Sequence, residues 1–294
     1  MKRRTLLGLL SGLPLLAGCS ATGLLNLLAP SAHRREAGIA YGPHPRMKLD
    51  VYRPLDTSGP APVVVFFYGG SWNAGRREDY LFVGAALAER GIVTVIPDYR
   101  LYPEVVYPAF LDDCAAAVAW AMDNAAAHGA DPGRLHVAGH SAGAYNAAML
   151  ALDARWLGRL GRGTDRLAGL VGLAGPYDFL PIVNPDVKPV FNRPGVEDPA
   201  PADSQPLRHV SAAAPRSLLI AAREDDLVNP QRNTGGLAQA LRDSGVAVDE
   251  RYYDGVNHLT LVGAFGRPLR GLAPVIDDVT RFVLHDGRNS HASR

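Results

Sequence analysis

The segment GHSAG at residues 139–143 has the residue types and spacing of a nucleophile turn. It joins a buried-looking apolar run, residues 135–138, to a stretch with helical periodicity. In the pattern G-x-S-x-G the serine lies on a sharp turn between strand and helix, and the glycines leave room where the two elements come close. The sequence therefore predicts that Ser141 is a nucleophile at the edge of a sheet.

A serine hydroxyl needs a general base to accept its proton, and histidine is the usual one. Of the nine histidines, only His258 lies in a loop just after a late predicted strand, in the segment DGVNH at 254–258. His140 adjoins Ser141, but neighbouring side chains on a tight turn diverge, so we do not expect it to reach the serine hydroxyl. The sequence therefore predicts His258 as the base.

A carboxylate that orients the base is expected after the strand that precedes it in the chain. The segment EDDLV at 224–228 supplies three acidic neighbours. Asp225 is favoured because it stands three residues before Val228, in a D-x-x-V spacing in which the apolar residue packs under the loop and the aspartate turns toward the histidine. Asp226 is the second candidate and Glu224 the third. Asp98 precedes Ser141 in the chain and is interpreted as a structural turn partner.

Acyl transfer also needs hydrogen-bond donors at the point where negative charge develops on the carbonyl oxygen. The segment YGGSW at 68–72 follows an apolar run typical of a buried strand, and its two glycines allow the backbone to approach a ligand closely. Together with the amide of Ala142, this loop predicts an oxyanion hole. The alternative is a Gly-Gly turn without a function.

Strands and helices alternate along most of the chain. An alternating run predicts an edge strand at 47–52. Further runs predict strands at 62–68, 92–96, 135–138, 167–174, 218–222 and 246–253. Helical periodicity and glycine stops predict helices at 78–90, 110–128, 142–152, 234–243 and 272–285. This order predicts an α/β fold, a mostly parallel central sheet with helices on both faces, whose edge carries the candidate residues.

The segment 176–215 interrupts this alternation with nine prolines, too many for a continuous helix or a central strand. An irregular insertion of this length in a compact domain is more often a lid or binding loop than a plain surface excursion. We therefore expect a small Pro-rich cap rather than a second domain.

The composition is that of a globular protein, with 294 residues, 47% of them apolar and 20% charged. Thirty basic and 29 acidic side chains leave a formal charge of +1, and the basic residues form no sustained run beyond 2–4. Nucleic-acid binding is therefore not expected, and the residues imply no metal or organic cofactor. Cys114 lies in an Ala-rich helical run and is interpreted as a buried apolar residue.

The N-terminus has the features of an export signal: KRR at residues 2–4, then an apolar stretch of about 13 residues, too short to span a bilayer. The stretch ends in LAGC at 16–19, which resembles the lipobox of bacterial lipoproteins and predicts lipidation of Cys19. The alternative is an ordinary signal peptide with a chance cysteine. RRTLL at 3–7 also resembles a weak twin-arginine signal, so either export route remains open.

Five motifs together resemble the α/β-hydrolase superfamily: YGGSW at 68–72, DYR at 98–100, GHSAG at 139–143, EDDLV at 224–228 and NH at 257–258. Within it the chain is similar to the hormone-sensitive-lipase-like carboxylesterases and to the feruloyl-esterase-like and arylformamidase-like branch. The resemblance covers about residues 46–285. Tyr68 replaces the usual histidine of the family's HGGG motif, and Ser71 replaces its third glycine.

The resemblance assigns the nucleophile to Ser141, the acid to Asp225, the base to His258, and the oxyanion donors to the amides of Gly70, Ser71 and Ala142. It implies a carboxylesterase that forms an acyl-enzyme and takes a small-molecule ester with a short or aryl acyl group. The alternatives are an arylformamidase-like amidohydrolase and a catalytically silent binding module.

The expected organisation has four parts. Residues 1–18 form the signal peptide, and 19–45 the lipidated N-terminus and a tether. Residues 46–285 form the hydrolase domain with its cap at about 176–215, and 286–294 are a tail. The protein is thus expected to be an exported lipoprotein on the periplasmic or extracellular face, in contact with a membrane through Cys19.

Overall fold

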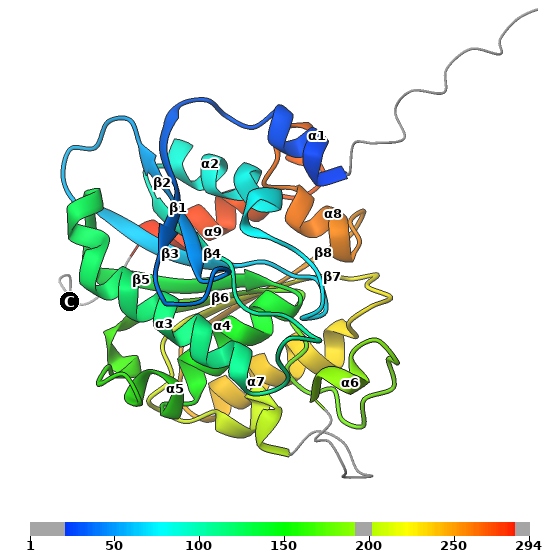
Figure 1. The fold of residues 1–294 in the computed structure, drawn as a ribbon. Helices are drawn as coiled ribbons and strands as arrows, with labels where there is room; N and C mark the ends of the chain where they lie inside the picture. Colours follow the sequence, from blue (N-terminus) through cyan, green and yellow to red (C-terminus); the bar gives the residue numbers. More distant parts are fainter. Residues whose placement is uncertain (1–20, 192–201, 286–294) are drawn as a thin grey trace, which may run out of the picture.

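The computed structural model describes residues 21–191 and 202–285, and in Figure 1 these form a sheet covered by helices on both faces. The sheet has eight strands in the order β1-β2-β4-β3-β5-β6-β7-β8. From β4 to β8 all neighbours in this order are parallel, whereas β2 is antiparallel to both β1 and β4. The predicted α/β fold with a mostly parallel sheet is therefore confirmed.

Each parallel strand brings its carboxyl end to the same edge of the sheet, which is where the candidate residues were expected. The strands are β1 (His33–Ala40), β2 (Lys48–Pro54), β3 (Ala61–Phe67), β4 (Val93–Pro97), β5 (Ala130–His140), β6 (Leu167–Leu173), β7 (Ser217–Ala222) and β8 (Val248–Tyr253).

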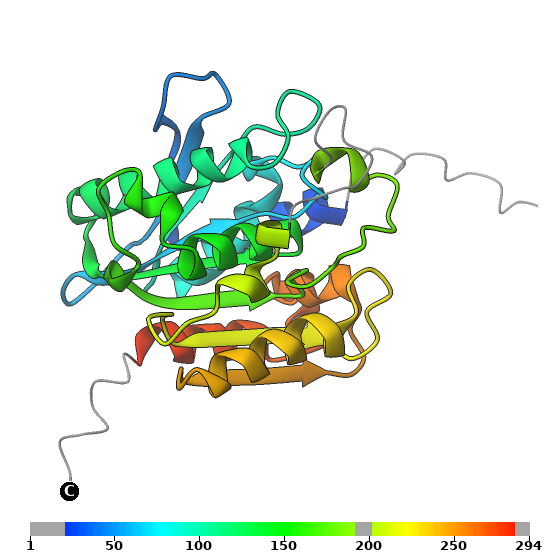
Figure 2. The ribbon, with the colours of Figure 1, turned by 90° about the horizontal axis from the view of Figure 1, so that it is seen from below.

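The helices form two layers. In Figure 1, α2 (Leu81–Glu89) and α9 (Val275–Leu284) cover one face of the sheet, while α3 (Ala109–Asn124), α4 (Ala142–Leu152) and α7 (Gly236–Asp243) cover the other. Figure 2 looks onto the face that carries α3, α4 and α7. Among the described residues there are also four short α-helices: α1 (Ala21–Leu27), α5 (Arg155–Gly158), α6 (Lys188–Phe191) and α8 (His258–Gly263).

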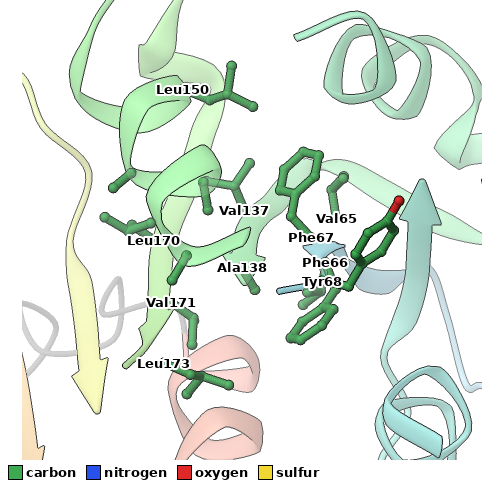
Figure 3. Close-up of a cluster of buried hydrophobic side chains, with 14 of the residues drawn as sticks. Val65, Phe66, Phe67, Tyr68, Val137, Ala138, Leu150, Leu170, Val171 and Leu173 are labelled. Carbon is green, nitrogen blue, oxygen red and sulfur yellow. The ribbon is translucent and has the colours of Figure 1, made fainter. Parts of the chain in front are cut away.

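The core lies where the central strands meet α4. All seven residues of β3 are buried, as expected for a strand covered on both faces. In Figure 3, Phe67 of β3 lies on the same side of the sheet as Val137 of β5 and Leu170 of β6. Phe66 lies on the opposite side, where its ring contacts those of Tyr80 and Phe265. Removing this apolar surface from water holds the turn at Ser141 on a rigid base.

Two expectations about the first half of the sheet require correction. The strand predicted at 47–52 is β2, but it is not an edge strand, because β1 pairs with it outside. Residues 33–40 were predicted to belong to a tether. Their polar sequence gives no alternating pattern, yet Asp50 of β2 binds them by accepting from Arg35 Nη2 at 2.7 Å and from the Gly38 amide at 2.8 Å.

The helix α1 also lies within the segment predicted to be a tether. A helix of seven residues is not stable alone, so its stability comes from packing. Leu25 is buried in the main core, and the side chain of Asn26 donates to the Glu78 carbonyl at 2.8 Å and accepts from the Phe82 amide at 3.0 Å. Residues 21–45, which were expected to belong to a tether, are therefore packed against the folded domain.

The Pro-rich segment contains only short helical turns where it is described: α6, then 3₁₀ turns at Ala202–Ser204 and Pro206–His209. Residues 192–201 of the expected cap lie outside the described residues, as do the predicted signal peptide, Cys19 and the predicted tail at 286–294. Within the described ranges, no helix is both long and apolar enough to cross a membrane.

Candidate active site

Ser141 occupies the turn between β5 and α4, with φ 54° and ψ −124°. A non-glycine residue held in such a backbone state costs on the order of 1–3 kcal/mol, and such residues cluster at functional sites. The glycines of the motif are required by space: a Cβ on Gly139 would lie 2.2 Å from the Gly143 carbonyl oxygen, and a Cβ on Gly143 would lie 2.0 Å from that of Phe67. The turn predicted from GHSAG is present.

The structure brings the three predicted side chains together. Nε2 of His258 lies 2.8 Å from Oγ of Ser141, and Nδ1 of His258 lies 2.7 Å from Oδ2 of Asp225. Ser141 and His258 are 117 positions apart in the chain, and Asp225 and His258 are 33 apart. His258 and Asp225 are both buried, so the chain of contacts runs from the protein interior to the serine.

Asp225 rather than Asp226 or Glu224 contacts the histidine, and its second oxygen explains why. Oδ1 of Asp225 accepts from the amides of Leu227 and Val228 at 2.9 Å each. These two bonds fix the carboxylate so that Oδ2 faces His258. Asp226 and Glu224 are exposed.

The charge on Asp225 is stabilised despite burial. Burial acts to raise the pKa of this carboxyl group, but the hydrogen bond and charge of His258 and the two backbone amides outweigh it and hold the pKa below its usual value. A charged carboxylate accepts only, so Nδ1 of His258 donates to it. Nε2 is then the acceptor for the Ser141 hydroxyl, as a general base requires.

His258 begins a short helix instead of lying in a loop as expected. Asn257 caps α8: its side chain accepts from the amides of Leu259 at 3.0 Å and Thr260 at 2.9 Å, while Thr260 Oγ1 accepts from the Asn257 amide at 2.8 Å. This capping box fixes the direction in which His258 leaves the backbone. The N-x-x-T spacing at 257–260 is the signal in the sequence that marks this helix start.

His140 has a contact that sequence reasoning missed. Nε2 of its side chain donates to the backbone carbonyl of His258 at 2.9 Å, and not to the Ser141 hydroxyl. Burial, aided by the nearby His258, lowers the pKa of His140 to about 3. His140 is therefore neutral at physiological pH and holds the backbone of His258 without adding a charge.

The glycine loop turns sharply, and three consecutive residues in it have positive φ angles. The φ angles of Gly70, Ser71 and Trp72 are 126°, 51° and 58°, and the Gly70 carbonyl accepts from the amides of Asn73 and Ala74 at 3.0 Å each. The amides of the three expected oxyanion donors, Gly70, Ser71 and Ala142, donate to no acceptor in the described part of the chain.

Asp98 binds the first residue of this loop and a residue beyond its end. Oδ1 of Asp98 accepts from the Tyr68 hydroxyl at 3.0 Å and from the Arg77 amide at 2.8 Å, and its Oδ2 pairs with the Arg77 guanidinium. Arg46 adds a contact from outside, donating to the Gly75 carbonyl at 2.5 Å and to the Tyr68 hydroxyl at 3.2 Å. Asp98 is thus a structural partner of the turn, as interpreted from its position.

Two cavities are lined by Ser141. The first, about 170 Å³, is lined by Ser71, Ala142 and His258 and by apolar side chains of Trp72 and of the Pro-rich segment. The second, about 290 Å³, is lined by Gly70, Ser71 and His258, and by Thr22 of α1 and Leu259 of α8. The three amides of the expected oxyanion hole therefore belong to residues that border the space beside the serine hydroxyl.

The apolar wall of the first cavity comes from the start of the Pro-rich segment, including Phe179, Ile182 and Val187. Asn184 is its polar member from that segment. Within residues 21–191 and 202–285, no three His, Cys, Asp or Glu side chains cluster as ligands for a metal ion. Cys114 is fully buried, and burial raises the pKa of its thiol, so it is unreactive.

The family model BD-FAE matches residues 49–241 of this chain. Among curated proteins, the chain is similar to a probable isoprenylcysteine alpha-carbonyl methylesterase of Oryza sativa, with 29% identity over 285 residues, 86% of this chain and 64% of that protein. It is also similar to the probable carboxylic ester hydrolase LipM of Mycobacterium tuberculosis, with 30% identity over 235 residues, 74% of this chain and 54% of LipM. The chain thus spans less than two thirds of the length of each of these relatives.

Solved structures with the same fold include a truncated carbohydrate esterase from gut microbiota, with a TM-score of 0.74 and 19% identity over 89% of this chain and all of that one. A thermostable esterase from Pseudomonas putida has a TM-score of 0.68 and 24% identity, over 89% of this chain and 86% of that one. At these identities the likeness concerns the fold.

Proposed function

The chain belongs to the BD-FAE family of the α/β-hydrolase superfamily, and we propose that it is a serine carboxylesterase. The observation that carries this proposal is the continuous contact from Asp225 through His258 to Ser141 at the border of two cavities. The names of the curated relatives, a methylesterase and a carboxylic ester hydrolase, support an ester rather than an amide as substrate.

In the first half of the reaction, the Ser141 hydroxyl attacks the ester carbonyl carbon while its proton passes to Nε2 of His258. Asp225 stabilises the imidazolium that forms. The negative charge on the carbonyl oxygen is held by the free amides of Ser71 and Ala142, with Gly70 as the third donor of the loop. The carbon–oxygen bond to the alcohol then breaks, and the alcohol leaves with the proton from Nε2.

In the second half, water takes the place of the alcohol. His258 accepts a proton from water, whose oxygen attacks the acyl carbon of the acyl-enzyme. The bond to Ser141 Oγ breaks, the serine regains its proton from Nε2, and the carboxylic acid is released. Both halves use the same charge-stabilising groups, and the strained turn at Ser141 keeps the hydroxyl in place between them.

The acyl group is proposed to occupy the first cavity. Its walls are apolar except for Asn184 and the residues around the serine, and Trp72 and Phe179 stack at its border with ring centres 6.2 Å apart. A cavity of about 170 Å³ with such walls suits a short alkyl or a single aryl acyl group. Long acyl chains are expected to be poor substrates.

The protein is proposed to be an exported lipoprotein that remains attached to a membrane through Cys19. The basic, apolar and LAGC segments of residues 2–19 support this. Signal cleavage would leave Cys19 as the lipidated first residue of the mature chain.

A fluorophosphonate probe and a paired substrate panel test the proposed activity. The probe is expected to add its mass to Ser141 of the wild type and to leave Ser141→Ala unmodified. The value of kcat/KM for p-nitrophenyl acetate is expected to exceed that for an N-formyl aromatic amide, and Ser141→Ala is expected to lose at least about 10⁴-fold in kcat.

Each part of the proposal has its own refutation. Unmodified wild type would favour the silent binding module, and labelling that persists in Ser141→Ala would show that another serine is the nucleophile. Faster cleavage of the formyl amide than of the ester would favour the amidohydrolase instead.

A further inference from the structure

The position of α1 connects the expected anchor at Cys19 directly to the active site. Leu25 packs near Gly263 and Gly266 at the end of α8, and Asn26 is hydrogen-bonded to the segment that precedes α2 and to α2 itself. Figure 1 shows α1 beside α2 and α8, the helix that begins at His258. The orientation of α1 on the domain is therefore fixed.

Thr22 of α1 lines the second cavity together with Ser141 and Leu259. Thr22 is three residues after Cys19, and three residues of extended chain reach at most about 11 Å. A flexible tether of 27 residues would allow the domain any orientation above a membrane. With α1 folded, the lipidated residue must lie close to the mouth of the active site.

The same region exposes large apolar side chains. On α1, Leu24 and Leu27 are 52% and 81% exposed. At the borders of the two cavities, Val183, Leu227 and Leu259 are 88%, 69% and 66% exposed. We call these five residues the apolar rim. Leu25, between the two leucines of α1, is buried, so Leu24 and Leu27 project away from the domain.

An exposed apolar surface next to a binding site marks a place of contact with another apolar phase. The anchor identifies that phase, because the lipid on Cys19 holds α1 at the bilayer and the rim lies at the same end of the molecule. A single acyl chain gives only weak attachment, and stable attachment takes a second membrane-binding element. The apolar rim can supply that second element.

We propose that the apolar rim lies in the surface of the bilayer to which Cys19 is attached, so that the active site opens toward the lipid. The substrates are then amphiphilic esters whose apolar part stays in the membrane while a short acyl group enters the first cavity. The orientation rests on lipidation of Cys19, and the substrate class rests in addition on the proposed esterase activity.

Cysteine accessibility in the anchored protein tests the orientation. The lipidated chain is reconstituted in phosphatidylcholine vesicles and exposed to a membrane-impermeant maleimide. Cys114 is buried and unreactive, so a single introduced cysteine reports its own surroundings. Leu24→Cys and Leu27→Cys probe the rim. Leu55→Cys and Leu160→Cys are matched controls, since these leucines are 48% and 42% exposed and belong to other parts of the fold, Leu55 directly after β2 and Leu160 between α5 and β6.

The rim cysteines are expected to react at least about tenfold more slowly than the controls, and detergent is expected to remove the difference because it dissolves the bilayer. Equal rates in vesicles would overturn the proposal. Slow labelling that persists in detergent, or in the unlipidated Cys19→Ser chain, would show that protein covers the rim, either a partner or a second copy. Release of the wild type from vesicles would refute the anchor on which the orientation depends.

A second measurement tests the substrate class. The double variant Leu24→Glu/Leu27→Glu is expected to keep its kcat/KM for soluble p-nitrophenyl acetate. On hexadecyl acetate carried in the vesicles, it is expected to lose about tenfold or more. The control variant Leu55→Glu/Leu160→Glu is expected to keep both activities. Equal losses on the two esters, or none, would overturn this part of the proposal.

The two proposals fail separately. A wild type that hydrolyses neither ester would refute the esterase activity, while the labelling pattern would still report the orientation. An active enzyme with equal labelling rates would refute the orientation alone.

Discussion

Exchanging Asp225 for asparagine tests the proposed roles most directly, because the structure dictates how the new amide must turn. Oδ1 of Asp225 accepts from the amides of Leu227 and Val228, both at 2.9 Å, and Oδ2 faces Nδ1 of His258 at 2.7 Å. Asparagine has a single oxygen, and the N–H groups of Leu227 and Val228 already point at the Oδ1 position. Its NH₂ group must therefore face His258.

An NH₂ group donates, so Nδ1 of His258 has to accept and the ring proton moves to Nε2. In that tautomer Nε2 donates toward Ser141 and cannot take the serine proton. The expected loss in kcat is about 10⁴-fold, the size of effect that the same exchange causes in the Ser-His-Asp triad of another fold. This corresponds to about 5 kcal/mol of transition-state stabilisation. KM is expected to change little, because Asp225 lines neither cavity.

Steady-state kinetics with p-nitrophenyl acetate measure this loss, and thermal unfolding shows whether the variant is folded. Asp226→Asn is the matched control, since Asp226 is the next residue, is exposed and has the same charge; it is expected to keep full activity. A folded Asp225→Asn enzyme within tenfold of the wild-type kcat, or a comparable loss in Asp226→Asn, would refute the reasoning about the tautomer.

Three further outcomes are expected. In Gly143→Ala the new Cβ would lie 2.0 Å from a main-chain oxygen at the end of β3, so the free energy of unfolding measured in urea should fall by about 3 kcal/mol or more. Gly236→Ala is the control, because a Cβ there has nothing within 4 Å, and its free energy of unfolding should stay within about 1 kcal/mol of the wild-type value. The pKa of His140 in the folded state, about 3, lies below its value in the unfolded chain, so the unfolded state binds a proton that the folded state does not. The free energy of unfolding therefore falls as the pH drops from about 6.5 toward 3, by up to about 1.4 kcal/mol per pH unit. In His140→Gln the free energy of unfolding should depend less steeply on pH in this window, and an unchanged slope would contradict the assignment. Tyr68→Phe removes the hydroxyl that donates to Asp98 and should lower the free energy of unfolding in urea by about 1–2 kcal/mol. Its kcat should also fall, because the glycine loop loses one of its attachments. An unchanged kcat would show that the loop does not need this bond.

Much of the site could be predicted from the sequence because a parallel sheet gathers distant residues at one edge. Ser141, Asp225 and His258 each follow a different strand, and the order of strands sets their proximity. The D-x-x-V spacing also selected the aspartate that contacts His258, but for another reason than expected. The main contribution of Val228 is its backbone amide, which returns to Asp225, rather than packing beneath the loop.

The elements that the sequence did not reveal are short and depend on tertiary contacts. The helix α1 has seven residues and β1 has a polar sequence, so neither has a periodicity that distinguishes it from a linker. Their stability comes from residues elsewhere in the chain, such as Asp50 and Glu78. The role of His140 was hidden for the same reason, because its hydrogen-bond partner is 118 positions away.

The two departures in the glycine loop, Tyr68 and Ser71, show what the proposed chemistry requires of this segment. Asp98 binds the loop at its first residue, Tyr68, and at Arg77 just beyond it, so the path of the backbone is set from outside the site. A tyrosine can occupy the first position because its hydroxyl reaches Asp98. Ser71 keeps a φ of 51°, a conformation in which a glycine would have no steric strain. Since the donors are main-chain amides, their direction depends on this enforced path and not on the side chains, and both substitutions are compatible with an oxyanion hole at the same place.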